Sequence, residues 1–161
     1  NAKQPAYKLL GELKIRFFTP MVWKLRIRQG KRVRQQVPFM PDLLFVYDSR
    51  KVLDPLVEQI ATLQYRFVKG GNHQPMTVRN ADMERFIRAV DAMNNPCFYT
   101  PEKINPDMLG KKVRIVGGLL DGYEGCLQKM QGSRIKRLFV ELPNLLTAAV
   151  EVQPEFIQVL R

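Results

Sequence analysis

A stretch rich in proline and asparagine near the middle of the chain divides the sequence into two regions with different patterns. Three prolines, each preceded by Asn or Thr, fall close together at Pro96, Pro101 and Pro106. Prolines at this density favour an extended, semi-rigid connector. We therefore predict two domains, at residues 1–94 and 108–161, joined by a linker at residues 95–107.

The composition limits the classes of protein to consider. Hydrophobic residues make up 45% of the chain and charged residues 25%, which is typical of a soluble chain that folds around a core. The apolar runs are too short for a transmembrane helix, and the first residues do not read as a signal peptide. Cys97 and Cys126 are the two cysteines. They predict a reduced, cytoplasmic protein without a disulfide framework or a structural zinc site.

The sequence also argues against catalysis. It contains no paired carboxylates at a plausible spacing, no Ser/His/Asp set and no metal cluster. The single histidine, His73, lies in a glycine-rich stretch, where we expect an exposed loop. We therefore expect no enzymatic activity and no cofactor.

The net charge of +11 is the first functional indication. The chain has 26 Lys and Arg against 15 Asp and Glu. The first 99 residues hold 17 of the basic and 8 of the acidic side chains, so the excess belongs to the N-terminal part. Such an excess is typical of proteins that bind a polyanion, either nucleic acid or an anionic membrane surface, although it also keeps a surface well solvated.

A basic hairpin is the strongest local signal. Trp23, Leu25 and Ile27 alternate with cations, the period-2 pattern of a half-buried strand, and Gln29-Gly30 predicts a turn. The hairpin contains no acidic residue. Its six cations are Lys24, Arg26, Arg28, Lys31, Arg32 and Arg34. Like charges on facing strands repel, so we predict that a nucleic-acid phosphate backbone compensates them. The alternative is a splayed hairpin whose charges point into water.

The rest of the N-terminal part is predicted to mix helices and strands. Residues 5–13 suit a short helix, and Asp54-Pro55 predicts a second helix that starts there and buries Leu56, Ile60 and Leu63. A last helix follows Asn80, because four apolar residues recur at helical spacing. These four are Met83, Phe86, Ile87 and Val90. Short apolar runs predict further strands, at residues 43–47, 65–68 and 76–78. The order favours an α+β sandwich with helices on one face of an antiparallel sheet.

The C-terminal part is predicted to be all β. Apolar runs separated by Gly, Asn, Ser or Pro predict about five short strands, which can close into a small barrel. The clearest runs are at residues 113–116, 125–128, 138–142 and 149–152.

Two motifs in this order resemble a known family. Residues 110–127 resemble a KOW motif, with Gly118, a loop, Gly122, an aromatic residue and Gly125 between two strands. Residues 17–20 (FFTP) and 37–46 (VPFMPDLLFV) resemble the Phe-x-Pro and Pro-x-Phe-Pro-Gly-Tyr-x-Phe-Val elements of an NGN domain. Residues 66–68 and 74–76 fit its later part. The chain thus resembles the NusG family of transcription elongation factors over nearly its whole length.

The departures from the family pattern point to a specialised paralogue. Asp42-Leu43 stands where the family has Gly-Tyr, and Met40 stands where it has Phe. The chain is similar in this respect to the RfaH and UpxY-type antiterminators, and to the latter more. The family's opening strand is absent before the first helix. We expect either that this strand precedes residue 1 in the native protein, or that a neighbouring molecule adds a strand there and makes an oligomer.

The resemblance implies a fold and a first partner. It implies a ferredoxin-like NGN domain, followed by a small SH3-like KOW barrel. In this family the NGN domain docks an apolar concavity onto the clamp helices of RNA polymerase and contacts the non-template DNA strand. By motif position the docking residues are Pro41, Leu43, Phe45, Phe18, Pro20 and Phe67. The alternative is that these side chains pack under the domain's own helices.

The resemblance also implies that the KOW domain recruits a second partner, either termination factor Rho, ribosomal protein NusE or RNA. Tyr123 stands where the family often has an aromatic residue in the recruiting loop, and three leucines extend that surface. These leucines are Leu120, Leu145 and Leu146. The alternative for Tyr123 is a ring that caps the end of the barrel. The alternative function is a ribosomal KOW-type RNA-binding protein, which would have no reason to carry the N-terminal motif.

Overall fold

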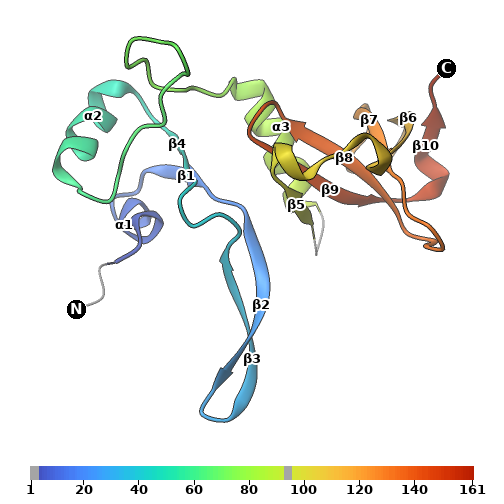
Figure 1. Cartoon of the computed structure of the whole chain (residues 1–161), viewed down its shortest axis with the longest axis horizontal. Coiled ribbons are helices and arrows are strands. Elements are labelled where there is room, and N and C mark those ends of the chain that lie inside the picture. The colour runs from blue at the N-terminus through green and yellow to red at the C-terminus, as the bar shows by residue number, and fades with distance from the viewer. Residues whose placement is uncertain (1–3, 93–95) are drawn as a thin grey trace. The chain divides into compact units, whose positions relative to one another are not determined.

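The computed structural model describes residues 4–92 and 96–161, and it divides the chain into two compact units (Figure 1). The first unit ends at Val78 and the second begins at Arg79, whereas we predicted a domain boundary near residue 94. Asn94 and Asn95, where the predicted linker begins, lie outside the described residues.

The first unit combines two helices with two small antiparallel sheets. Strands β1 and β4 form one sheet, and β2 and β3 form the other. In chain order the elements are α1 (Ala6–Glu12), β1 (Arg16–Phe18), β2 (Met21–Arg28), β3 (Lys31–Pro38), β4 (Phe45–Tyr47) and α2 (Arg50–Gln59). The strands predicted at residues 65–68 and 76–78 are reduced to an isolated bridge between Phe67 and Pro75. The predicted strand addition at the β1–β4 sheet stays a prediction.

Helix α2 differs from the sequence prediction at its start. The helix begins at Arg50 and contains Pro55, so the predicted start after Asp54 is wrong. The carbonyl oxygen of Ser49 accepts hydrogen bonds from the backbone N–H groups of Val52 and Leu53, at 3.1 and 3.0 Å. This closes a first turn ahead of the proline, which then removes only one donor from the helix.

The core of the first unit is small. Its buried residues among those described are Leu10, Thr19, Pro20 and Leu43. The hydroxyl of Thr19 donates a hydrogen bond of 3.1 Å to the backbone carbonyl oxygen of Leu43. This bond joins the segment after β1 to the segment before β4. These are the two segments that carry most of the predicted docking residues.

The second unit contains one helix and one six-stranded sheet. All strand pairs are antiparallel, in the order β10-β6-β7-β8-β9-β5. The elements are α3 (Asn80–Asp91), β5 (Cys97–Tyr99), the 3-10 turns η1 (Pro101–Lys103) and η2 (Pro106–Met108), β6 (Leu109–Ile115), β7 (Glu124–Gln128), β8 (Lys136–Leu142), β9 (Leu146–Val152), η3 (Pro154–Phe156) and β10 (Ile157–Val159). The predicted α+β class, with an all-β C-terminal region, is confirmed.

Part of the predicted linker belongs to this sheet. Strand β5 pairs with β9, with Phe98 opposite Ala148. The prolines at 101 and 106 begin short 3-10 turns. The predicted linker therefore includes one strand of the sheet, residues 97–99, and two short turns.

Helix α3 packs on strands β8 and β9 of the second unit. Phe86 and Ala89 are completely buried, and Met83, Ile87 and Val90 are half-buried, as the helical spacing predicts. The ring of Phe86 lies 6.3 Å from that of Phe98 on β5. The apolar side chains of this helix thus form part of the core of the second unit.

Candidate functional site

The β2–β3 hairpin has the turn that the sequence predicts. Gln29 and Gly30 have φ values of 50° and 73°, and positive φ at both central residues is the mark of a type I′ turn. The strands pair without a bulge from Met21 opposite Pro38 to Arg28 opposite Lys31. In Figure 1 the hairpin extends away from helices α1 and α2 of its own unit.

The register sorts the six cations onto two faces. Directly opposed residues share a face, and successive residues of a strand alternate. Lys24, Arg26 and Arg28 therefore share one face with Lys31. The other face carries the remaining two cations together with the apolar row of β2. These residues are Arg32, Arg34, Trp23, Leu25 and Ile27.

The apolar row of β2 is exposed. Trp23, Leu25 and Ile27 have 48%, 69% and 77% of their surface accessible. The predicted half-burial of this row is therefore wrong. A period-2 pattern shows that the two faces of a strand differ, but a face is buried only where another layer of the protein packs on it. Because β2 and β3 form a separate two-stranded ribbon, the apolar face stays exposed. The guanidinium of Arg34 lies over the indole ring of Trp23, 4.9 Å from its centroid.

The predicted polymerase-docking residues fall into two groups. Phe18 and Phe45 are directly opposed across β1 and β4, with ring centroids 6.3 Å apart, and both are half-buried. Leu43 and Pro20 are buried beside them. Pro41 is exposed. These five residues come from two adjoining segments, so the structure brings together most of the predicted set.

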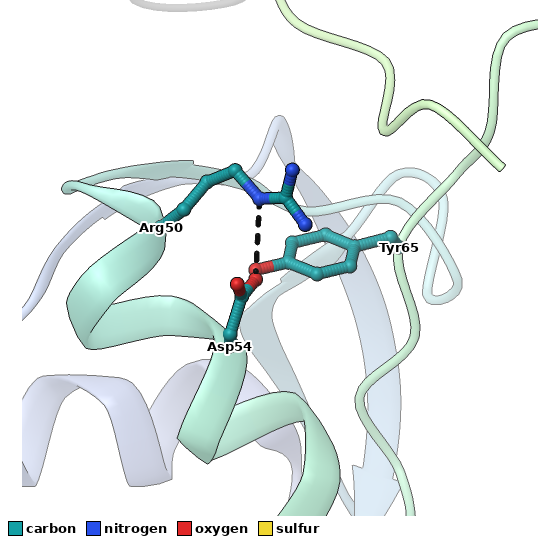
Figure 2. A network of polar contacts seen from close by, with 3 residues as sticks. All are labelled: Arg50, Asp54 and Tyr65. Carbon is teal, nitrogen blue, oxygen red and sulfur yellow. Dashed lines mark hydrogen bonds and ion pairs between the residues drawn. The ribbon is translucent and has the colours of Figure 1, made fainter.

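Phe67 lies on a separate segment that a polar network holds in place. Phe67 is 40% exposed, and its ring lies nearly perpendicular to that of His73, with 5.4 Å between the two centroids. Two residues earlier, the hydroxyl of Tyr65 donates a hydrogen bond of 2.6 Å to Asp54 Oδ1 (Figure 2). Arg50 Nε lies 3.4 Å from the same oxygen. This network ties the Phe67 segment to helix α2.

The network changes the acidity of its two titrating members. Burial and the hydrogen bond to Asp54 raise the pKa of Tyr65 to about 12. The hydrogen bond from Tyr65, helped by Arg50, lowers the pKa of Asp54. Both shifts favour the arrangement seen in Figure 2, a neutral phenol bound to an ionised carboxylate.

The predicted partner-binding residues of the second unit lie mostly inside it. Leu120, Tyr123 and Leu146 are buried, and Leu145 is half-buried. Leu119, next to Leu120, is 74% exposed. Gly117 and Gly118 have positive φ, which turns the loop so that Leu120 points inward. The sequence shows two adjacent leucines and no signal to separate them, so our prediction missed Leu119.

Tyr123 is held by helix α3. Its hydroxyl donates a hydrogen bond of 2.8 Å to the backbone carbonyl oxygen of Arg85, whose guanidinium lies 4.6 Å from the centroid of the ring. The same guanidinium donates a hydrogen bond to the backbone carbonyl oxygen of Glu124 at 3.0 Å. Burial raises the pKa of Tyr123, and the nearby Arg88 and Arg85 partly oppose that rise.

Within residues 4–92 and 96–161, no group of three or more His, Cys, Asp or Glu side chains is placed to hold a metal ion. In the same ranges no helix is long and apolar enough to cross a membrane. The candidate sites in the described residues are therefore the hairpin, the two groups of docking residues and the loop that carries Leu119.

The chain matches a known protein family. A family model described as NusG, transcription termination factor nusG, matches residues 1–87. This range covers all of the first unit and runs into helix α3. No curated protein matches the chain.

Proposed function

Because the chain belongs to the NusG family, we propose that it is a transcription regulator that docks on RNA polymerase through its first unit and holds nucleic acid with the β2–β3 hairpin. Membership implies a transcription elongation or termination factor with RNA polymerase as partner, and factors of this family are not enzymes. The family match across the whole first unit is the observation that carries the proposal.

The proposed docking surface is the pair Phe18 and Phe45 with exposed Pro41 beside them, together with Phe67 on the separate segment that Tyr65 ties to α2. Half-buried aromatic rings keep apolar surface available while their own packing fixes their position. The surface would take an apolar helical element of the polymerase, the clamp helices in the family's usual arrangement. Leu43 and Pro20 contribute as the buried support beneath it.

The proposed nucleic-acid contact is the cationic hairpin, with the non-template DNA strand as its target. Within residues 13–41 there are eight cations and no Asp or Glu. Each Lys or Arg that reaches a phosphate releases condensed counterions, so a ribbon of this charge gains most of its affinity from phosphate contacts. An exposed ribbon also leaves both faces accessible to a strand.

The proposed recruitment of a second partner, Rho, NusE or RNA, involves the second unit. Leu119 is the exposed apolar residue of the loop at which we predicted recruitment. We place Tyr123, Leu120 and Leu146 behind it as support, with half-buried Leu145 at their side. The proposal includes antitermination of the RfaH and UpxY kind, which rests on Asp42-Leu43 and Met40 in the motif and on no other observation.

Co-purification with RNA polymerase tests the proposal. Replacing the exposed ring in Phe67→Asp, and the half-buried one in Phe45→Asp, should each abolish capture of polymerase, because a charge would have to be desolvated at an apolar contact. The matched control is Leu119→Asp, which adds the same charge at an exposed apolar residue of the second unit and should leave capture unchanged.

Capture of ribosomes in place of polymerase would overturn the proposal and support an RNA-binding role of the ribosomal kind. Unchanged polymerase capture by both Phe variants, with their circular dichroism unaltered, would move the docking surface elsewhere. Loss of capture by Leu119→Asp as well would show that the second unit takes part in docking.

A further inference from the structure

The exposed apolar row of the hairpin is not explained by phosphate contacts. Trp23, Leu25 and Ile27 stand side by side on one face of β2, each about half exposed or more. A contiguous apolar row with a tryptophan, displayed on a thin ribbon, is uncommon on a protein surface that binds nothing apolar. Four of the six cations lie on the opposite face, so a purely electrostatic contact would leave this row in water.

Cations frame the apolar row on its own face. Arg32 is directly opposite Ile27, and Arg34 is directly opposite Leu25. The Arg34 guanidinium covers part of the indole of Trp23, and 48% of the Trp23 surface stays open. The face therefore offers a flat aromatic and aliphatic platform with two positive charges beside it.

We propose that this face binds the bases of a single-stranded nucleic acid, with Trp23 as the stacking platform and Leu25 and Ile27 as its extension. The inference rests on the proposed nucleic-acid contact of the hairpin. An unpaired strand presents base planes and phosphates together, and base stacking on aromatic side chains tolerates any sequence. A duplex keeps its base planes inside the stack and would use the cations alone.

The arrangement of charge favours a nucleic-acid strand over an anionic membrane. A flat lipid surface meets only one face of the ribbon and would leave Lys24, Arg26, Arg28 and Lys31 pointing away. A flexible strand can lay its bases on one face and pass its phosphates around the edge to the other. The absence of any acid on the hairpin fits a polyanion on both faces.

Trp23 is the single tryptophan of the chain, so its fluorescence reports on this face directly. We would titrate the full chain with an oligothymidine of about twelve nucleotides, within the usual site size of one binding domain. A duplex and an abasic strand of the same length are the comparison ligands. We expect strong quenching by oligothymidine, and weak quenching by the two ligands that offer no free base.

The variant Trp23→Ala should lower the affinity for oligothymidine about tenfold or more and leave the affinity for the duplex and the abasic strand unchanged. Trp23→Phe should keep most of the preference, because a smaller ring still stacks. The matched control is Val33→Ala, which removes an exposed apolar side chain opposite Arg26, on the other face of the same ladder. It should leave all three affinities unchanged.

The outcomes distinguish failure of the proposed nucleic-acid contact from failure of the proposed base stacking on Trp23. If Arg26→Ser with Arg28→Ser leaves binding of every oligonucleotide unchanged, the nucleic-acid contact itself fails. If that variant weakens binding but Trp23→Ala does not change the preference for the single strand, the stacking inference is overturned and the phosphate contact stands. Quenching by phosphatidylglycerol vesicles and not by oligothymidine would assign the face to a membrane surface.

Discussion

The hydroxyl of Tyr123 donates a hydrogen bond of 2.8 Å to the backbone carbonyl oxygen of Arg85, and the Arg85 side chain covers the same ring at 4.6 Å. The two residues are far apart in the sequence, yet each fixes the other. The Arg85 carbonyl lies in α3 and accepts the tyrosine hydroxyl with the lone pair that the helix leaves available. The bond therefore anchors α3 to the residue before β7. The family match ends within this helix, at residue 87.

Removal of that hydroxyl should weaken the second unit. We expect Tyr123→Phe to lower its free energy of unfolding by about 1 kcal/mol, the usual net value of one buried hydrogen bond. Hydrogen exchange of the β8 and β9 amides in the full chain measures this change. Tyr47→Phe, at an exposed position, is the control and should leave exchange unchanged. Equal exchange in the two variants would mean that the bond to Arg85 adds no stability.

The raised pKa of Tyr65 predicts that the folded chain loses stability at alkaline pH. Its pKa is about 12 in the folded chain against 10.0 for an ordinary tyrosine. Folded Tyr65 thus keeps its proton where the unfolded chain loses it. Its contribution to the free energy of unfolding is therefore complete below pH 10 and falls as the pH rises towards 12. Denaturant unfolding at several pH values, with the full chain and Tyr65→Phe, measures this contribution as the difference between the two curves.

The same variant tests the acid side. The lowered pKa of Asp54 stabilises the folded chain above the ordinary value of 3.8, and this stabilisation is lost as the pH falls through the lowered value. Tyr65→Phe should therefore flatten the decline at both ends of the pH range. A variant that shifts the whole curve without changing its shape would indicate that the Tyr65–Asp54 bond does not couple to titration.

Gly118 and Gly132 form a matched pair for testing the glycine loop beside Leu119. Their φ values are 73° and 71°, but a Cβ on Gly118 would lie 2.9 Å from the Phe156 ring, while a Cβ on Gly132 meets no atom within 4 Å. Gly132→Ala should cost about 1 kcal/mol from its backbone conformation alone. Gly118→Ala should cost clearly more, because Phe156 must also move. Thermal unfolding of both variants gives the comparison, and equal melting temperatures would show that Phe156 yields freely.

Salt dependence tests the proposed phosphate contacts of the hairpin face that carries Arg26 and Arg28. Arg26→Ser with Arg28→Ser should make the slope of log affinity against log salt shallower by about one to two, at about 0.9 per duplex phosphate or 0.7 per single-strand phosphate. Lys111→Ser with Lys112→Ser removes the same charge from exposed positions on β6 and is the control. An unchanged slope in the Arg26 and Arg28 variant would place these side chains in water.

Several features followed from the sequence because they depend on residues close together in the chain. The Gln29-Gly30 turn follows from which residues tolerate positive φ. Helix α3 follows from apolar residues at helical spacing, and the β class of the second unit follows from short apolar runs between turn residues. The KOW-like motif at residues 110–127 and the NGN-like motifs at residues 17–20 and 37–46 together indicated the family, which the match over residues 1–87 confirms.

Other features were decided by contacts between distant residues, which no local pattern contains. The alternation of Trp23, Leu25 and Ile27 shows that β2 has two unlike faces, but only the absence of a covering layer over the ribbon leaves the apolar face exposed. The direction in which Leu119 and Leu120 point depends on the backbone of the glycine loop under Phe156. Helix α3 packs on β8 and β9, and this packing also brings the ring of Phe86 against the ring of Phe98 on β5. Local sequence fixes which conformations are accessible, whereas burial is settled by whichever surfaces meet when the chain folds.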